Sequence, residues 1–210
     1  MKAGASWLLR VTGVALIAAA ASRCEGRPPH SDRHDWQLAE VSEHGVTVTL
    51  RALVDDVPRT WVTATYVPTM SGFHLYSKDL PREGLSGIGR PTLFEVVPGG
   101  ALDPRGEVAA DQMPVPLYVP ALKLSFPVYP AGPVTLRLPV AMTAVGNRQA
   151  TFSVSYLACS DSICLAPVTG KRIVVTLPAG YARAGLAAQA LARAGRTSTD
   201  HWLAHETLAR

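Results

Sequence analysis

Two cysteines, Cys159 and Cys164, are separated by four residues in the segment 156–167. A bridge between them would close a very small loop, which is worth only about 2 kcal/mol to a fold. A pair carried on a loop suits thiol–disulfide exchange, because exchange requires in-line access to a sulfur. Asp161 lies between the two cysteines and adds a negative charge that disfavours a thiolate. The spacing alone leaves three interpretations open: a redox pair, a structural bridge and a pair of metal ligands.

The elements that position this pair are predicted to be short strands. Residues 45–54 alternate apolar side chains with Thr and Arg, the period of two that is typical of a half-buried strand. Similar patterns, separated by Pro, Gly, Asn and Asp, follow at 61–67, 73–77, 92–97, 123–129, 134–142, 151–158 and 172–177. Gly146 and Asn147 indicate a hairpin turn between two of them. We therefore expect an all-β protein, an antiparallel β-sandwich.

The two ends of the chain have a different character. Residues 1–21 carry Lys2 and Arg10, then a short apolar run that ends in small residues, the order typical of a secretory signal peptide. The alternative is an uncleaved N-terminal membrane tether, and Cys24 raises the further alternative of lipidation. Residues 22–35 are predicted to be a flexible leader, and 36–178 the sandwich. The Ala- and Leu-rich segment 181–194 predicts a short C-terminal α-helix that Gly195 ends, within an extension over 179–210.

Composition excludes several classes of protein. The chain has 210 residues, 48% of them hydrophobic, and a formal net charge of +4, so it is not a disordered chain. No cluster of Lys and Arg is interleaved with aromatic residues, so we expect no nucleic-acid partner. Ser160 and Ser162 flank no obvious base, which argues against a hydrolase. We expect no cofactor and no bound metal.

The cysteine segment resembles a known family. Residues 154–167, Val-Ser-Tyr-Leu-Ala-Cys-Ser-Asp-Ser-Ile-Cys-Leu-Ala-Pro, resemble the active hairpin of the N-terminal periplasmic domain of DsbD, the thiol:disulfide interchange protein. A second match lies at 72–78, Gly-Phe-His-Leu-Tyr-Ser-Lys, which is similar to that family's Gly-aromatic-His/Tyr-Leu-Tyr segment. The resemblance covers roughly residues 36–178. The cysteine spacing is one residue shorter than in the best-known member.

The resemblance implies an immunoglobulin-like sandwich and a role for each cysteine. Cys164 is the position that forms the mixed disulfide with a partner, and Cys159 is the resolving cysteine. The resemblance also implies a cap loop that shields the pair, and by its order in the chain this loop falls within 107–118. The residues that it places beside the pair are His74, Tyr76, Tyr156, Asp161 and Pro167, and its candidates for the cap loop are Met113 and Leu117.

The resemblance also implies partners. Such a domain takes reducing equivalents from a thioredoxin-like domain, itself reduced through a membrane electron conduit. It passes them to periplasmic oxidoreductases and to cytochrome c maturation proteins, as the disulfide-reductase component of the system. No conduit or thioredoxin-like domain follows residue 178, so we expect a separate donor protein. The alternative hypothesis is a non-catalytic β-sandwich module for binding or assembly, with a structural disulfide.

Overall fold

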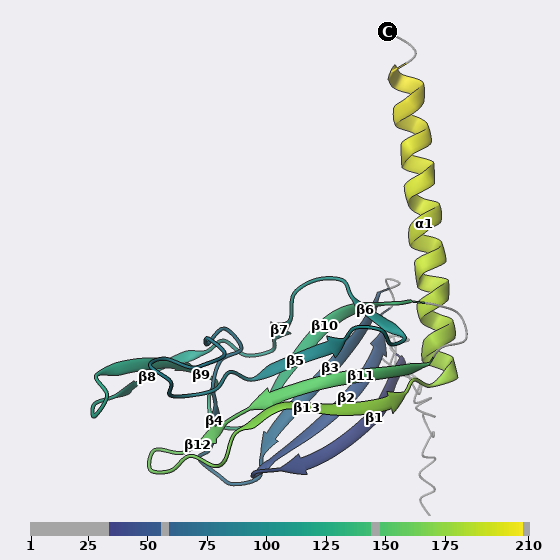
Figure 1. Cartoon of the computed structure of the whole chain (residues 1–210). Coiled ribbons are helices and arrows are strands. Elements are labelled where there is room, and N and C mark those ends of the chain that lie inside the picture. Colours follow the sequence, from purple (N-terminus) through teal and green to yellow (C-terminus); the bar gives the residue numbers. More distant parts are fainter. Residues whose placement is uncertain (1–33, 56–58, 144–147, 208–210) are drawn as a thin grey trace, which may run out of the picture. The chain divides into compact units, whose positions relative to one another are not determined.

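The computed structural model of the protein describes residues 34–55, 59–143 and 148–207. Within these ranges the chain forms antiparallel strands and one C-terminal helix, so the all-β prediction is confirmed (Figure 1). The predicted signal peptide and nearly all of the predicted leader lie outside the described residues. The elements are β1 (His34–Glu43), β2 (Val46–Val54), β3 (Thr60–Pro68), β4 (His74–Leu75), β5 (Leu93–Val97), β6 (Leu102–Pro104), β7 (Ala109–Ala110), β8 (Val115–Val119), β9 (Leu124–Val128), β10 (Val134–Met142), β11 (Gln149–Tyr156), β12 (Ala158–Cys159), β13 (Val168–Thr176) and α1 (Ala179–Thr207).

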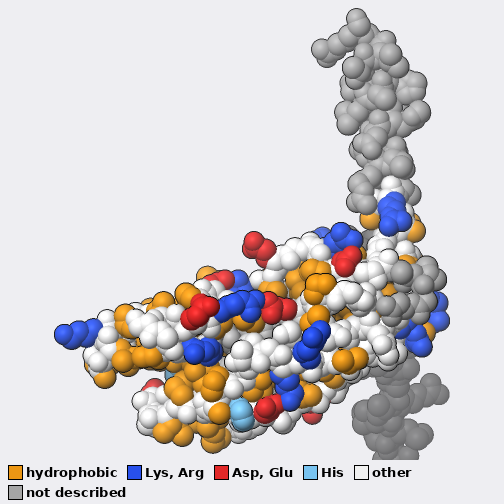
Figure 2. All heavy atoms as spheres, viewed as in Figure 1, with side chains coloured by type: hydrophobic (Ala, Val, Ile, Leu, Met, Phe, Trp, Pro, Cys, Tyr) orange, Lys and Arg blue, Asp and Glu red, His pale blue; other side chains and the backbone are white. Residues whose placement is uncertain are grey.

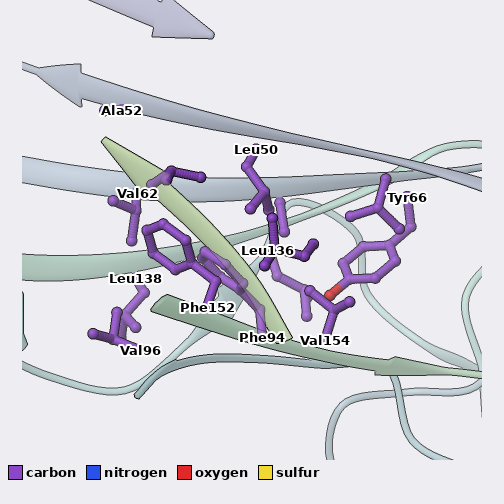
Figure 3. Close-up of a cluster of buried hydrophobic side chains, with 14 of the residues drawn as sticks. Leu50, Ala52, Val62, Tyr66, Phe94, Val96, Leu136, Leu138, Phe152 and Val154 are labelled. Carbon is purple, nitrogen blue, oxygen red and sulfur yellow. The ribbon is translucent and has the colours of Figure 1, made fainter. Parts of the chain in front are cut away.

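Two sheets enclose the main hydrophobic core. One has the order β1-β2-β3-β10-β6, with β7 also paired to β10, and the other has the order β13-β11-β5. Strand β2 buries every second side chain, as its alternating sequence predicts. Figure 3 shows side chains of both sheets meeting in the core, and those labelled are Leu50, Ala52, Val62, Tyr66, Phe94, Val96, Leu136, Leu138, Phe152 and Val154.

The predicted hairpin turn at Gly146 and Asn147 is wrong. These two residues lie outside the described ranges, but the strands on either side of them are in different sheets. Strand β10 pairs with β3, whereas β11 pairs with β13 and β5. Alternation tells which face of a strand is buried and says nothing of its partner. The chain therefore passes from one sheet to the other at this point.

Strand β1 was not predicted, and it begins within the segment taken as a leader. It pairs with β2 across a two-residue turn in which His44 and Gly45 have φ of 45° and 72°. These are the positive φ values that a tight hairpin turn requires. The pairing register shifts between Gln37 and Ala39, a bulge that interrupts the period of two. The bulge and the partial exposure of this strand explain why its sequence pattern is weak.

Helix α1 is 29 residues long, so the prediction of a short helix ending at Gly195 is wrong. A glycine inside a helix costs only about 1 kcal/mol relative to alanine, and no proline follows it in the chain. Gly185 allows a close approach, since a Cβ there would lie 2.9 Å from Met142 of β10. No helix in the described part of the chain is both long and apolar enough to cross a membrane.

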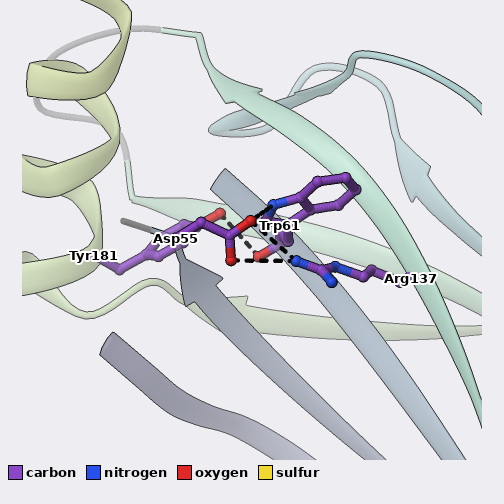
Figure 4. Close-up of polar contacts among 4 residues, drawn as sticks. All are labelled: Asp55, Trp61, Arg137 and Tyr181. Atoms are coloured by element: carbon purple, nitrogen blue, oxygen red, sulfur yellow. Dashed lines mark hydrogen bonds and ion pairs between the residues drawn. The ribbon is translucent and has the colours of Figure 1, made fainter. Parts of the chain in front are cut away.

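A polar cluster fixes the start of the helix (Figure 4). The hydroxyl of Tyr181 donates to the backbone carbonyl of Trp61 at 3.3 Å. The carboxylate of Asp55 accepts from the Trp61 indole at 2.7 Å and pairs with Arg137 at 3.2 Å. The Arg137 guanidinium lies 4.0 Å from the Trp61 ring centroid, a cation–π contact. These contacts join α1 to the six-stranded sheet.

Candidate functional site

The two cysteines form a disulfide whose sulfurs lie in different environments. Cys159 is at the end of β12 and is only 2% exposed, whereas Cys164 is on the exposed loop that follows. A thiol that attacks this bond in line can therefore reach Cys164, and Cys159 becomes the leaving sulfur. The asymmetry comes from position, because one cysteine belongs to a paired strand and the other to a loop.

The loop between the cysteines is closed by backbone hydrogen bonds as well as by the disulfide. The N–H of Ser160 donates to the carbonyl of Ile163 at 2.8 Å. The N–H of Leu165 donates to the carbonyl of Ala158 at 3.0 Å. The geometry of the loop therefore does not depend on the sulfur–sulfur bond alone.

Strand β4 and the residue that follows it place two polar aromatic side chains on the side of the buried cysteine. Cys159 pairs with His74 in the register of β12 and β4, so their side chains lie on the same face. Tyr76 is two residues further on and faces the same way. Its hydroxyl lies 3.6 Å from the sulfur of Cys159, and its ring meets that of His74 edge to face at 5.9 Å.

Burial determines the charge state of both aromatic groups. It lowers the pKa of His74, while the carboxylate of Asp161 acts in the opposite direction with a smaller effect. The imidazole is therefore neutral at neutral pH. Its Nε2 atom is buried and has no hydrogen-bond partner. Burial also raises the pKa of Tyr76, so the phenol keeps its proton and can donate to the sulfur.

A pocket of about 420 Å³ opens over the disulfide. It lies between the cysteine loop and the hairpin formed by β8 and β9. The residues that line it are His74, Tyr76, Ile88, Leu117, Tyr118, Val119, Pro120, Leu122, Phe126, Cys159, Ser160, Asp161, Ser162, Ile163 and Cys164. Most of the lining from the β8–β9 hairpin is apolar, so this hairpin covers the pair with hydrophobic side chains.

The base of the β8–β9 hairpin is fixed by backbone hydrogen bonds to the segment after β4. Ser77 donates to the carbonyl of Pro127 at 2.9 Å, and Tyr129 donates to the carbonyl of Leu75 at 2.8 Å. Phe126 is fully buried, and its ring packs against Tyr76 at 5.7 Å. The hairpin thus holds one wall of the pocket in a defined place beside the sulfur.

A tight turn supplies Ile88 to the opposite wall. Leu85 and Ile88 exchange two backbone hydrogen bonds around Ser86 and Gly87, which both have positive φ. Gly89 then lies against the Tyr76 ring, where an added Cβ would be 3.1 Å from a ring carbon. A glycine is therefore needed at this position both for its φ of 79° and for the close approach.

The rim of the pocket is apolar and exposed. Tyr118 is 59% exposed and Ile163 is 55% exposed, although both are large hydrophobic residues. Figure 2 shows hydrophobic side chains gathered over the β8–β9 hairpin. Exposed apolar groups of this kind, next to polar ones, are typical of a surface that contacts another protein.

The structure brings together six of the residues expected at the site. Cys159, Cys164, His74, Tyr76, Asp161 and Leu117 all line the pocket. The sequence did not single out the other apolar residues of the lining, which are Ile88, Tyr118, Val119, Pro120, Leu122, Phe126 and Ile163. Their patterns are ordinary strand and turn patterns, and nothing local marks them as neighbours of the cysteines.

The predicted cap-loop window at 107–118 supplies only part of the pocket lining. Leu117 lines the pocket, but Met113 is 83% exposed and is not among the lining residues. Much of the covering wall comes from residues after Tyr118, including Leu122 and Phe126. The cover is a β-hairpin whose two strands both contribute, so a window on one strand describes only half of it.

Tyr156 and Pro167 do not line the pocket. The ring of Tyr156 lies in the main core, 5.7 Å from Tyr66, and its hydroxyl donates to the carbonyl of Glu43 at 3.0 Å. Strand alternation explains the difference, because Tyr156 and Ala158 face the main core while Cys159 faces the other side. The parity of the residue numbers relative to Cys159 is the signal in the sequence for this difference in facing.

In the described part of the chain, no group of three or more His, Cys, Asp or Glu side chains lies close enough together to hold a metal ion.

No family model matches the sequence, and no curated protein matches it either. The structure does resemble solved domains. It is similar to the N-terminal domain of DsbD from Neisseria meningitidis.

The structure of that domain is of its reduced form, and its sequence is 16% identical to this one. The match covers 61% of this chain and 83% of that chain, with a TM-score of 0.40. The N-terminal periplasmic domain of ScsB from Proteus mirabilis is 11% identical. That match covers 75% of this chain and 59% of that chain, with a TM-score of 0.43.

Proposed function

We propose that this protein is an exported thiol–disulfide exchange protein that relays reducing equivalents through Cys159 and Cys164. One observation carries the proposal: the disulfide has one exposed sulfur and one buried sulfur, at the floor of an apolar pocket. The exposed sulfur suits attack by a partner, and the buried one suits the role of leaving and resolving group. The loop is closed by backbone bonds as well, which argues against a purely structural need for the bridge.

The exchange conserves atoms and electrons at each step. A partner thiolate attacks the sulfur of Cys164, a partner–Cys164 disulfide forms, and the Cys159–Cys164 bond breaks. Cys159 leaves as a thiolate beside the hydroxyl of Tyr76 and takes up a proton. A second partner thiol then attacks the partner's own sulfur, which releases Cys164 as a thiolate and leaves the partner oxidised. The reduced pair passes the two electrons to an acceptor disulfide by the reverse sequence.

The partners of this proposal are those that the resemblance to the DsbD N-terminal domain implies, and the apolar rim suits them. A thioredoxin-like donor linked to the membrane presents a reactive cysteine on an apolar surface, and the exposed Tyr118 and Ile163 suit such a contact. Periplasmic disulfide oxidoreductases or cytochrome-maturation proteins are the proposed acceptors. The β8–β9 hairpin, with Leu117 on its inner side, is proposed to shield the pair from other thiols.

Trapping of the mixed disulfide tests the proposal. Cys159→Ser, in a chain that also carries Cys24→Ser, should accumulate a disulfide-linked complex with a thioredoxin-like protein through Cys164. Cys164→Ser is the matched control and should trap far less, because the remaining sulfur is buried. Equal trapping by both variants, or by neither, contradicts the assigned roles.

The reduction potential of the pair tests the same proposal against the alternative of a binding module with an inert bridge. A midpoint within the range of known oxidoreductases, about −120 to −270 mV, supports exchange. A disulfide that stays closed below about −300 mV would favour the structural role. The measurement uses the oxidised protein equilibrated in graded thiol buffers.

A further inference from the structure

His74 combines three properties that the exchange of sulfurs alone does not explain. Its side chain is buried, at 7% exposed, and is directly opposite Cys159 in the register of β4 and β12. Its Nε2 atom is buried without a hydrogen-bond partner while the disulfide is closed. Buried polar atoms in proteins are nearly always paired, and an unpaired one is costly. Such an atom, on a residue paired in register with Cys159 and lining the same pocket, calls for a chemical explanation.

The groups that face His74 are few. Tyr76 follows β4 two residues after His74, with the rings 5.9 Å apart. Asp161 on the cysteine loop is the charged group whose field acts on the imidazole. Tyr118 is the ionisable residue that the β8–β9 hairpin contributes to the pocket lining. The pocket lining therefore offers His74 one carboxylate, two phenols and the sulfurs.

We propose that His74 is the proton acceptor and donor for the sulfur of Cys159, a role that rests on the proposed exchange function. When the pair is reduced, the Cys159 thiol is freed from the disulfide and can turn toward the unpaired Nε2. When Cys164 holds an acceptor in a mixed disulfide, Nε2 takes the thiol proton as the Cys159 sulfur attacks the Cys164 sulfur. The Cys159–Cys164 bond forms again, and the acceptor departs as a thiolate that takes the proton from the imidazolium, so His74 is neutral once more.

The reverse direction starts with neutral His74, so the proton comes from the donor. The donor thiol passes its proton to Nε2 of His74 as its sulfur attacks Cys164, Cys159 leaves as a thiolate, and the imidazolium gives this proton to the Cys159 sulfur. No oxidant or reductant is needed beyond the donor and acceptor already named. A buried thiolate without a proton source is unfavourable, because burial disfavours the charged form.

Tyr76 cannot take this role, although its hydroxyl is 3.6 Å from the sulfur. Burial raises its pKa, so the phenol keeps its proton at neutral pH and acts as a donor only. Burial lowers the pKa of His74, so its imidazole is neutral there and can accept. The two residues are therefore expected to have different roles. Tyr76 stabilises the Cys159 sulfur by donating a hydrogen bond, and His74 accepts and returns the proton.

A two-phase reaction with dithiobis(nitrobenzoate) tests this assignment. In reduced protein carrying Cys24→Ser, Cys164 attacks the reagent and releases a first thionitrobenzoate. Cys159 then attacks Cys164 and releases a second one, so the second phase reports the step that needs the proton acceptor. Both rates are measured against pH in the wild type, in His74→Gln and in His34→Gln. His34 is an exposed residue of β1 and serves as the matched control.

In the wild type, the rate of the second phase should rise with pH while His74 loses its proton. It should level off below about pH 6.5, because burial lowers the pKa of this imidazole from its ordinary value. In His74→Gln the second phase should be slower at pH 7 by about 100-fold or more, since a positioned general base typically contributes about 10²–10⁴-fold. The rate of the second phase in His74→Gln should also rise about tenfold for each unit of pH, until the Cys159 thiol itself ionises. The first phase should keep its rate, and His34→Gln should match the wild type in both phases.

Three results distinguish the possible failures. If the wild type and His74→Gln have second phases with the same pH profile, the proton role of His74 is overturned while exchange stands. If both phases slow equally, with no change in the profile, His74 has only a structural role. If the wild type shows no second release, the exchange function itself fails.

A measurement on the wild type alone covers the case in which His74→Gln does not fold. The pH midpoint of the second phase should coincide with the titration of the His74 imidazole, followed by NMR in the reduced protein. A midpoint more than about one pH unit away from that titration overturns the proposal, because a fast general base must be poised in its basic form.

Discussion

The main core and the cluster around Cys159 both bury tyrosines, but they treat the polar atoms of those residues differently. In the core, the hydroxyls of Tyr66 and Tyr156 donate to backbone carbonyls at 2.7 Å and 3.0 Å. In the cysteine cluster, the hydroxyl of Tyr76 lies against a sulfur, and Nε2 of His74 has no partner. The cysteine cluster consists of Tyr76, Leu80, Phe126, Val128, Leu157 and Cys159.

This difference shows that the groups which stabilise the sandwich and the groups which lie beside the reactive sulfur are in different parts of the domain. Fully satisfied polar groups in the core hold a single arrangement of the two sheets. Polar groups that are buried but only weakly paired remain available to a reacting sulfur, at a cost in stability. The fold can carry that cost because the cysteine cluster is small and lies beside the main core.

The largest expected effect comes from removing a core aromatic ring. Phe152 is fully buried and stacks on Phe94 with 5.4 Å between ring centroids. We expect Phe152→Ala to lower the free energy of unfolding by about 3–5 kcal/mol, because it leaves a cavity between the two sheets. Denaturant unfolding of the oxidised protein measures this loss.

Phe126→Ala is the matched change in the cysteine cluster. It should lower the free energy of unfolding by clearly less than Phe152→Ala does, because the side chains that line the adjacent pocket can relax into the space. It should also accelerate reduction of the disulfide by small thiols, since one wall over the sulfur is lost. Equal losses of stability for the two variants would contradict the division between core and cluster.

An intermediate effect is expected from removing single hydroxyl groups. Tyr156→Phe should cost about 1 kcal/mol, because it deletes the hydrogen bond to Glu43 and leaves the carbonyl unpaired. Tyr76→Phe should change stability by less, since its partner is a weak sulfur acceptor. Unfolding curves measure both changes.

Exchange kinetics should reverse that order. Tyr76→Phe should slow reduction of the pair by partner thiols, because the Cys159 thiolate loses its donor, whereas Tyr156→Phe should leave the rate unchanged. If Tyr156→Phe affects exchange as much as Tyr76→Phe does, the two tyrosines do not have separate roles.

The smallest effect concerns an exposed ion pair between Glu43 and Lys171 on the outside of the sandwich. The hydrogen bond from Lys171 lowers the pKa of Glu43. The unfolded chain therefore protonates Glu43 first as pH falls, so the contribution of the pair is complete above about pH 4.5. It is lost as pH falls further, through the folded-state pKa.

Lys171→Met should therefore lower the thermal midpoint slightly at pH 7 and by progressively less in more acidic buffer. Thermal unfolding of both proteins at several pH values checks this trend. A difference that grows toward low pH would contradict the sign of the shift, and exchange rates should be the same in both proteins.

Much of the frame could be predicted from the sequence, because it depends on local patterns. Alternation in residues 46–54 and 134–142 predicted strands that the structure contains as β2 and β10. Strand β1 was missed because a bulge interrupts its alternation. The length of α1 was underestimated because one internal glycine was taken as an end signal.

At the site, the sequence by itself determined the positions of the cysteine pair, its short loop and the alternation of faces within each strand. Alternation puts Tyr156 and Cys159 on opposite faces of their segment and His74 and Tyr76 on one face of theirs, whereas the register that sets His74 opposite Cys159 belongs to the tertiary structure. Only the tertiary structure decided which sulfur is exposed, which hairpin covers it and which buried nitrogen has no partner. The reason is that these properties depend on contacts between distant parts of the chain, such as Tyr76 and Cys159, which are 83 positions apart. Local sequence patterns do not predict which distant strands will pair.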